Sequence, residues 1–176
     1  MITLEQLQKC CITKEGKARA EKYLPGIQKA QQSLLTTQIR LSYFLGQILH
    51  ESGEFRYVEE LASGKAYEGR IDLGNTHPGD GVRYKGRGLI QITGRYAYDM
   101  CGKALGLDLI DHPELLEQPE AAVSSAVWFW HVHDLNTLAD HHNYAAITRR
   151  INGGMNGWQN RLYYAQAAEK ALGTTA

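Results

Sequence analysis

The sequence lacks any apolar run long enough to cross a lipid bilayer, for which a helix needs about 20 predominantly apolar residues. Its first residues, MITLEQLQKCC, lack the basic segment followed by an apolar one that marks a secretory signal, so we expect synthesis in the cytoplasm. Cysteine is scarce, and Cys10, Cys11 and Cys101 do not have the spacing of metal ligands. We therefore expect three ordinary reduced thiols.

The chain also lacks an excess of charge of either sign, because its 19 basic and 19 acidic side chains cancel. Proteins that bind nucleic acid or anionic membranes need a basic surface, so the balance argues against both kinds of partner and against a helical DNA-binding domain. A local basic patch around Arg83, Lys85, Arg87 and Arg95 stays open.

The chain contains enough apolar residues to form one hydrophobic core, since 43% of its 176 residues are hydrophobic. The pattern predicts a helix over residues 3–22 with Thr3 as its N-cap, punctuated after it by Pro25 and Gly26. A second predicted helix starts near Thr36 and Thr37. It carries the buried stripe Leu41, Phe44, Leu45, Ile48 and Leu49.

The middle of the chain is different, with eight glycines between Gly64 and Gly94. Such a density excludes a helix and predicts turns and short strands. Helices resume afterwards, with Pro113 and Pro119 each placed to open one and with Gly153 and Gly173 placed to end two more. We predict a single mainly α domain over residues 1–176, with a glycine-rich β/loop insertion at about 64–94 that lines a cleft.

The stretch FLGQILHESGEF places Glu51 at the end of the second helix, three residues after Ile48 and beside the buried stripe. Apolar surroundings and the carbonyl groups of the helix end both disfavour the ionised carboxylate. A protonated carboxyl near neutral pH is what a general acid requires. The alternative is a solvated glutamate paired with Arg56.

Glycosidic chemistry needs a second carboxylate, and Glu59, Glu60 and Glu68 are the candidates. In inverting glycosidases the two carboxyl groups lie roughly 6.5–9.5 Å apart, which leaves room for a water molecule. Glu59 and Glu60 follow the helix closely, and either could be a surface residue. Glu68 stands in AYEGR, where glycine lets the backbone approach a ligand.

The segment RYKGRGLIQITGR follows. Read as a strand, LIQIT puts Ile90 and Ile92 on one face and Leu89, Gln91 and Thr93 on the other. Two polar groups on one face could hold a water molecule and a sugar hydroxyl. The alternative is a half-exposed strand.

Later residues offer weaker signals. Trp128, Phe129 and Trp130 favour a place in the core over a carbohydrate platform, and the asparagines of RRINGGMNGW can simply cap helices and turns. The histidines form no HExxH motif and have no cysteine nearby, so we predict no metal; these are His131, His133, His141 and His142.

Taken together, FLGQILHESGEF, AYEGR, GVRYKGRGLIQITGR and RRINGG resemble, in that order, the family 19 glycoside hydrolases of plant chitinases and phage endolysins. The similarity runs from about Thr36 to Leu172. The single-domain format, with no separate wall-binding domain, is similar to the phage or prophage enzymes. The resemblance implies a lysozyme-like fold that cleaves β-1,4 links next to N-acetylglucosamine-type sugars by a usually inverting mechanism, without metal or cofactor.

Residue by residue, the resemblance implies that Glu51 is the general acid, that Glu68 is the base with Glu60 as the alternative, and that Thr93 positions the attacking water. It also implies substrate contacts for the remaining matched side chains, with Arg161 resembling a structural arginine of the family; these are His50, Glu60, Gln91, Tyr96, Asn152 and Arg161.

The leading hypothesis is therefore a monomeric endolysin that hydrolyses peptidoglycan glycan strands. The resemblance implies that such an enzyme is made in the host cytoplasm, does not insert stably into the membrane, and reaches the periplasmic wall through a separately encoded pore. The alternatives are a chitinase on the same scaffold and a non-catalytic peptidoglycan-binding module.

Overall fold

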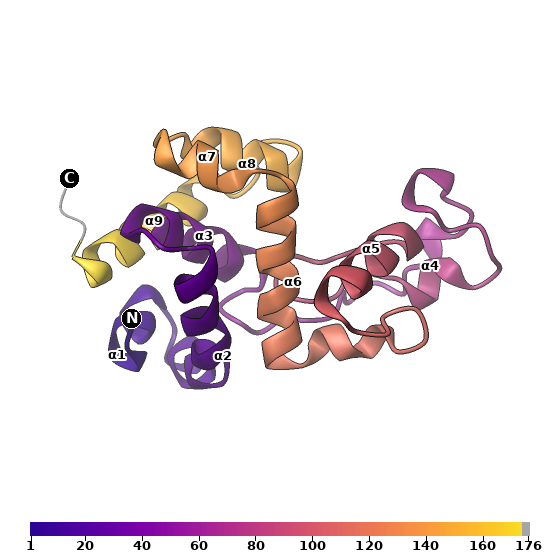
Figure 1. Ribbon diagram of the computed structural model, residues 1–176, viewed down its shortest axis with the longest axis horizontal. Coiled ribbons are helices and arrows are strands. Elements are labelled where there is room, and N and C mark those ends of the chain that lie inside the picture. The colour runs from indigo at the N-terminus through magenta and orange to yellow at the C-terminus, as the bar shows by residue number, and fades with distance from the viewer. Residues whose placement is uncertain (174–176) are drawn as a thin grey trace.

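The computed structural model describes residues 1–173 of the chain, in which helices connected by turns dominate (Figure 1). The elements in chain order are α1 (Leu4–Cys10), α2 (Lys14–Ser33), α3 (Gln38–Glu51), η1 (Lys65–Tyr67), η2 (Ile71–Leu73), α4 (Asp80–Arg83), α5 (Arg95–Leu105), η3 (Pro113–Glu117), α6 (Pro119–Val132), α7 (Leu135–Asp140), α8 (Tyr144–Asn152) and α9 (Trp158–Leu172). The predicted mainly α class is confirmed.

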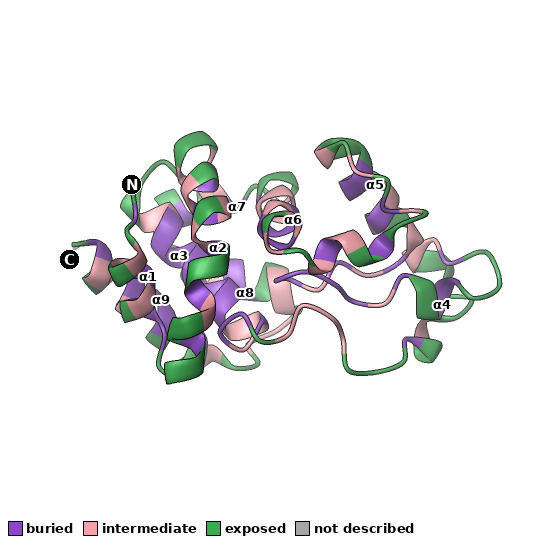
Figure 2. Cartoon of the chain, turned by 90° about the horizontal axis from the view of Figure 1, so that it is seen from below, coloured by how far each residue is buried: buried purple, intermediate pink, exposed green. Residues whose placement is uncertain are grey.

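The helices gather at two ends of the molecule. Figure 1 shows α1, α2, α3, α7, α8 and α9 at one end, α4 and α5 at the other, and α6 between them. In the larger group α3 packs along α9, while α6 contacts both α2 and α5 and so joins the two ends. Burial concentrates on α3, whose residues from Leu41 to Leu49 are all buried (Figure 2).

Close contact between α3 and α9 depends on a glycine. A Cβ at Gly46 would lie 2.4 Å from the Tyr144 hydroxyl oxygen and 2.8 Å from the Ala165 Cβ, so a larger side chain would push the helices apart. On the other side of α3, Phe44 packs edge-to-face on Trp130 with 5.4 Å between ring centroids. Trp130 thus belongs to the core, as predicted, whereas Trp128 and Phe129 are half-buried.

Most predicted helix limits are confirmed. Thr3 and Thr37 cap α1 and α3 through their side chains, and Pro113 and Pro119 open η3 and α6. Gly153, like Gly173 after α9, ends its helix with a positive φ, here 74° after α8.

Two predictions about the first helices are wrong. The helix expected over residues 3–22 is interrupted after Cys10, because Thr13 starts a new helix by accepting the Gly16 N–H. Pro25 does not end the next helix but lies inside α2. Packing against α6 outweighs the lost backbone donor: a Cβ at the adjacent Gly26 would lie only 3.1 Å from Val123, so α2 is held close to α6 there.

The glycine-rich insertion consists of short helices and turns. Among residues 1–173, β pairing is limited to the isolated bridges Glu59–Arg87 and Arg87–Ile92. The strand expected at LIQIT is instead a tight turn, because Gln91 has a φ of 57°. Leu89 is fully buried with Ile90 and Ile92, so the predicted alternation of faces is wrong.

No helix of the described chain is both long enough and apolar enough to cross a membrane.

Candidate active site

Glu51 is the last residue of α3, and its side chain is 20% exposed. The Arg161 Nη2 of α9 lies 2.6 Å from the Glu51 Oε1, an ion pair that the sequence did not predict. The expected alternative partner, Arg56, is exposed and stacks over the Tyr57 ring. The carboxyl is thus held in a partly buried place, but beside a cation and not only among apolar groups.

Arg161 is buried, with 1% exposure, and protein groups hold its guanidinium. Its Nη1 donates to the Gln47 Oε1 at 2.6 Å and its Nε donates to the Asn156 carbonyl at 3.0 Å. Gln47 in turn donates to the Thr148 hydroxyl at 2.9 Å, which ties α8 to the network. This burial separates Arg161 from solvent, where a sugar would bind. Its position therefore fits the structural arginine of the family, which would orient Glu51, better than a residue that contacts the sugar.

The chain turns sharply after Glu51. Gly53, Glu54 and Phe55 all have positive φ values, between 55° and 64°. The Ser52 hydroxyl supports the turn by accepting the Phe55 N–H at 2.8 Å while donating to the Ile48 carbonyl. The break expected at Gly53 is therefore a three-residue left-handed turn that directs the chain away from the helix.

Glu54 is a structural residue that the sequence did not reveal. Its carboxylate is buried and accepts hydrogen bonds from the Ile12 and Thr13 N–H groups, the Thr13 hydroxyl and the Tyr164 hydroxyl. Burial alone would raise the pKa of Glu54, but these donors lower it overall. A glutamate beside glycine in a polar turn is expected to be exposed, and no local pattern predicts partners 41 to 110 positions away.

Residues 58–60 then run beside the segment 86–88. The Glu60 N–H donates to the Gly86 carbonyl at 2.8 Å, and the Gly86 N–H donates to the Glu60 Oε2 at 3.0 Å. The Tyr67 hydroxyl donates to the Glu60 Oε1 at 2.9 Å. This half-buried carboxylate therefore has one defined orientation.

Gly86 brings Glu60 and Gln91 together. A Cβ at Gly86 would lie 2.7 Å from the Gln91 Oε1 and 3.2 Å from the Glu60 Oε2, so both oxygens occupy the space beside its bare Cα. The Gln91 amide is held by donation to the Gly88 carbonyl at 3.0 Å, and the Thr93 hydroxyl donates to the Gln91 carbonyl at 2.9 Å. Gln91 thus contacts two other residues selected from the sequence, Glu60 through the space at Gly86 and Thr93 through its own backbone carbonyl.

Glu68 lies elsewhere. It is exposed, and its two carboxylate oxygens accept the Gly79 N–H at 2.6 Å and the Gly81 N–H at 2.9 Å. Those bonds close the loop that carries η2 and the start of α4. Glu59, the remaining candidate, pairs with Lys85 at 2.8 Å.

The basic residues left open by the sequence each have acidic partners. Lys85 pairs with Glu59, Arg95 contacts Asp80 at 2.7 Å, Arg87 contacts Glu117 at 2.8 Å and Arg83 approaches Asp111 at 3.7 Å. They form ion pairs across the glycine-rich end and not an unpaired basic patch.

The other predicted contacts fall into two places. Near Glu51, the His50 Nδ1 lies 2.6 Å from the Asn160 Oδ1, and Asn152 accepts the Asn156 N–H at 3.2 Å. Tyr96 lies on α5, is 64% exposed, and lines a groove of about 420 Å³ together with Gln91 and Thr93. We name this cavity, between the Gln91 turn, α5 and α6, the α5–α6 groove.

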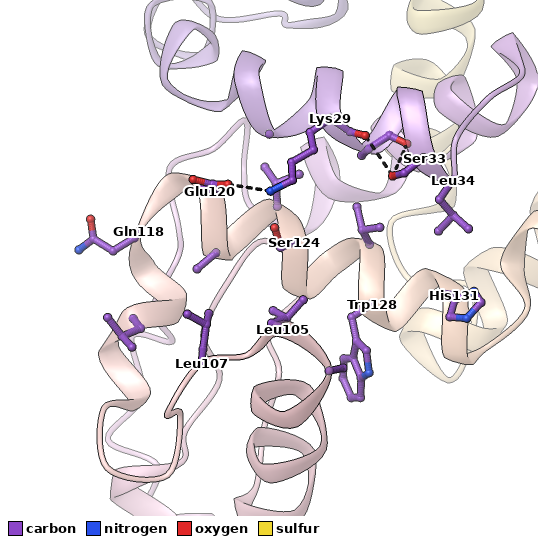
Figure 3. A pocket seen from close by; sticks show the side chains of 17 residues that line it. Lys29, Ser33, Leu34, Leu105, Leu107, Gln118, Glu120, Ser124, Trp128 and His131 are labelled. Atoms are coloured by element: carbon purple, nitrogen blue, oxygen red, sulfur yellow. Dashed lines mark hydrogen bonds and ion pairs between the residues drawn. The ribbon is translucent and has the colours of Figure 1, made fainter.

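A larger cavity, of about 830 Å³, lies between α2, α6 and the segment that joins α5 to η3 (Figure 3). Its polar side chains include Lys29 and Glu120, which form an ion pair at 3.1 Å across the cavity. None of the site residues selected from the sequence lines it. Within residues 1–173 no group of three or more His, Cys, Asp or Glu side chains is arranged to hold a metal ion.

Comparison with known proteins decides the family. The profile of the chitinase class I family, glycoside hydrolase family 19, matches residues 36–156. The chain belongs to this family. An endochitinase of Arabidopsis thaliana is 40% identical over 116 residues, which cover 65% of this chain and 39% of that protein. A glycosyl hydrolase family 19 domain-containing protein of Haemophilus influenzae is 41% identical over 108 residues, which cover 60% and 52%. The chain thus spans about half or less of the length of these relatives.

Solved structures agree on the fold. Chitinase C of Streptomyces griseus superposes with a TM-score of 0.74 at 24% identity, covering 99% of this chain and 77% of that one. The class IV family 19 chitinase of Zea mays gives 0.72 at 24% identity, covering 96% and 90%. These likenesses confirm the lysozyme-like helical fold.

Proposed function

We propose that the chain is a glycosidase that hydrolyses β-1,4 bonds of bacterial peptidoglycan. The observation that carries the proposal is a pair of carboxyl groups held in two different ways on one continuous segment. Glu51 ends α3 against the buried Arg161, and Glu60, nine positions on, lies with Gln91 beside Gly86. Membership of family 19 supports hydrolysis of glycosidic bonds.

Glu51 would act as the general acid. It protonates the glycosidic oxygen while the bond from that oxygen to the anomeric carbon breaks. Loss of the proton leaves a carboxylate, and the Arg161 guanidinium at 2.6 Å is placed to stabilise that negative charge as it forms. The buried network behind Arg161 keeps this contact in place throughout the step.

Glu60 would act as the base in place of Glu68. A water molecule on the opposite face of the sugar forms the new bond to the anomeric carbon and transfers one proton to Glu60, while its other O–H donates to one acceptor, the Thr93 hydroxyl oxygen or the Gln91 amide oxygen. Both carboxylates accept two hydrogen bonds, Glu68 from two N–H groups and Glu60 from one N–H and one hydroxyl, but the Glu60 Oε2 also shares the Gly86 surface with the Gln91 Oε1. Attack from that face inverts the anomeric centre.

The substrate has two candidates. Peptidoglycan comes first, because the motifs FLGQILHESGEF, AYEGR, GVRYKGRGLIQITGR and RRINGG resemble a family that includes phage endolysins. The named chitinases among the relatives favour chitin as the second candidate. Reducing-end release from purified sacculi and from N-acetylglucosamine hexamer, measured in parallel, separates the two.

Glu51→Gln tests the function itself. We expect loss of turnover on sacculi with an unchanged circular dichroism spectrum, because the amide cannot donate the proton. Glu120→Gln is the matched control, since Glu120 is exposed on α6 and should keep full activity. Retained turnover in Glu51→Gln would remove it as the acid. Sacculus binding by the wild type without any glycan cleavage would instead indicate a binding module.

A further inference from the structure

The α5–α6 groove includes Gln91 and Thr93, the two side chains proposed to hold the attacking water. The rest of its lining comes from the Gln91 turn, α5, α6 and His133. Its volume, about 420 Å³, falls within the range of cavities that bind small ligands. Any group attached to the sugar beside Thr93 can therefore extend into it.

The walls of the groove are apolar and partly open to solvent. Tyr96 and Met100 of α5 are 64% and 42% exposed, and Val132 of α6 is 51% exposed. Trp128 and Phe129 complete the α6 wall as half-buried rings. Three of the large hydrophobic side chains that are exposed on this protein thus border one groove. Such clustering marks a surface that contacts a ligand.

Among residues 1–173, no Asp, Glu, Lys or Arg side chain lines the groove; its polar groups are Gln91, Thr93, the Tyr96 hydroxyl and His133. The His133 ring stacks on Phe129 at 3.9 Å between centroids, and its Nδ1 lies 2.9 Å from the Phe129 carbonyl. The carbonyl can only accept, so the tautomer that fits this contact carries its proton on Nδ1 and offers Nε2 as an acceptor. The groove therefore suits a neutral group with methyl substituents and an amide N–H.

We propose that the α5–α6 groove binds the lactyl ether and the first stem residue of a muramyl sugar, and so selects peptidoglycan over chitin. This inference rests on the proposed peptidoglycan substrate. The lactyl group and an alanine beside it each bring a methyl group for the apolar walls, and the amide that joins them supplies an N–H for His133. The charged residues farther along a stem remain outside, in solvent. N-acetylglucosamine polymers have a hydroxyl at that position and nothing to fill the groove.

The test places a charge in the groove with Val132→Glu, matched by Val82→Glu. Val82 is 45% exposed on α4 and lies outside the groove, so both variants put the same side chain at a similarly open position. We measure kcat/KM on glycan strands with intact stems and on N-acetylglucosamine hexamer. We expect Val132→Glu to lose about tenfold or more on the strands and to match the wild type on the hexamer. Val82→Glu should match the wild type on both.

An equal loss on both substrates would show that the groove binds a sugar ring or an N-acetyl group. No loss on either substrate would show that nothing occupies the groove. Both results would overturn the inference and leave the proposed function standing. If the wild type cleaves the hexamer but no strand, the proposed substrate fails and the inference fails with it. Val132→Thr, which keeps the side-chain shape, serves if Val132→Glu does not fold.

Binding gives a readout without turnover. The neutral C-terminal amide of N-acetylmuramyl-L-alanine, titrated into Glu51→Gln protein, should shift the methyl resonances of Met100 and Val132 in an NMR spectrum, and N-acetylglucosamine should not. Equal shifts with both ligands, or none with either, would overturn the inference.

Discussion

The two carboxyl groups of the proposed site are positioned by different kinds of structure. Glu51 ends a long buried helix and contacts an arginine that is itself fixed by three helices. Glu60 lies in a turn region and is oriented by the N–H of a glycine and by a tyrosine hydroxyl. One position depends on buried charge and helix packing, and the other on backbone hydrogen bonds and the absence of a side chain at Gly86. The two should therefore fail in different ways.

The largest expected effect distinguishes Glu60 from Glu68. Glu60→Gln should lower kcat on sacculi by about 10²–10⁴-fold, the usual contribution of a general base. Glu68→Gln should retain activity within a few-fold, because its oxygens hold a loop and not the Gly86 surface. Steady-state assays on both variants measure the difference. The opposite ranking would return the base role to Glu68.

Substitutions around Glu51 should lower the free energy of unfolding more than substitutions around Glu60. Arg161→Met removes a buried cation and leaves the Gln47 amide oxygen unpaired, so we expect the free energy of unfolding to fall by about 3–5 kcal/mol. Urea denaturation measures it. Arg149→Met, at an exposed position on α8, should change it by less than about 0.5 kcal/mol. Similar losses in both variants would mean that the hydrogen bonds of Arg161 do not stabilise the folded protein more than an exposed arginine does.

The glycine-rich end has its own buried carboxylate, Asp80, to which the Arg95 guanidinium donates two hydrogen bonds of 2.7 and 2.8 Å. This pairing lowers the pKa of Asp80 to about 2 in the folded protein, from a reference value of 3.8. Because the folded pKa is depressed, the stabilisation is complete above pH 4 and is lost as the pH falls from about 4 towards 2. The loss should be about 2 kcal/mol.

Thermal unfolding between pH 2 and 6 measures this loss, and Asp80→Asn should flatten the curve in that window although the variant is less stable at pH 6. An unchanged slope in Asp80→Asn would assign the acid sensitivity to other carboxylates, such as Glu54.

A loss of similar size concerns Gly86. Gly86→Ala would place a Cβ 2.7 Å from the Gln91 Oε1, so we expect a loss of about 1–3 kcal/mol and a fall in kcat as Glu60 and Gln91 move. Gly154→Ala is the control, because a Cβ there meets nothing closer than 3.9 Å. Crystal structures or 15N relaxation of the two variants would show whether only Gly86→Ala displaces the Gln91 turn.

The sequence predicted the helical half better than the turn half. The stripe from Leu41 to Leu49, the Thr37 cap and the Gly153 stop follow local rules of period and capping, and each is present. The Glu51–Arg161 ion pair joins residues 110 positions apart, which no local rule predicts. In the insertion, the prediction of a strand with alternating faces was wrong because Gln91 has a left-handed backbone conformation. The presence of a glutamine does not predict that conformation. The choice between Glu60 and Glu68 rests on which carboxylate lies beside Gln91, a contact at Gly86 that no local sequence pattern predicts.

The central claim is that Glu51 and Glu60 act together on a glycosidic bond, with water attacking from the face opposite the leaving sugar. Proton NMR of the first product formed from purified glycan strands, recorded before mutarotation, tests it most directly. The wild type should release the α-anomer, and neither Glu51→Gln nor Glu60→Gln should release product at a comparable rate. Early accumulation of the β-anomer would contradict the account.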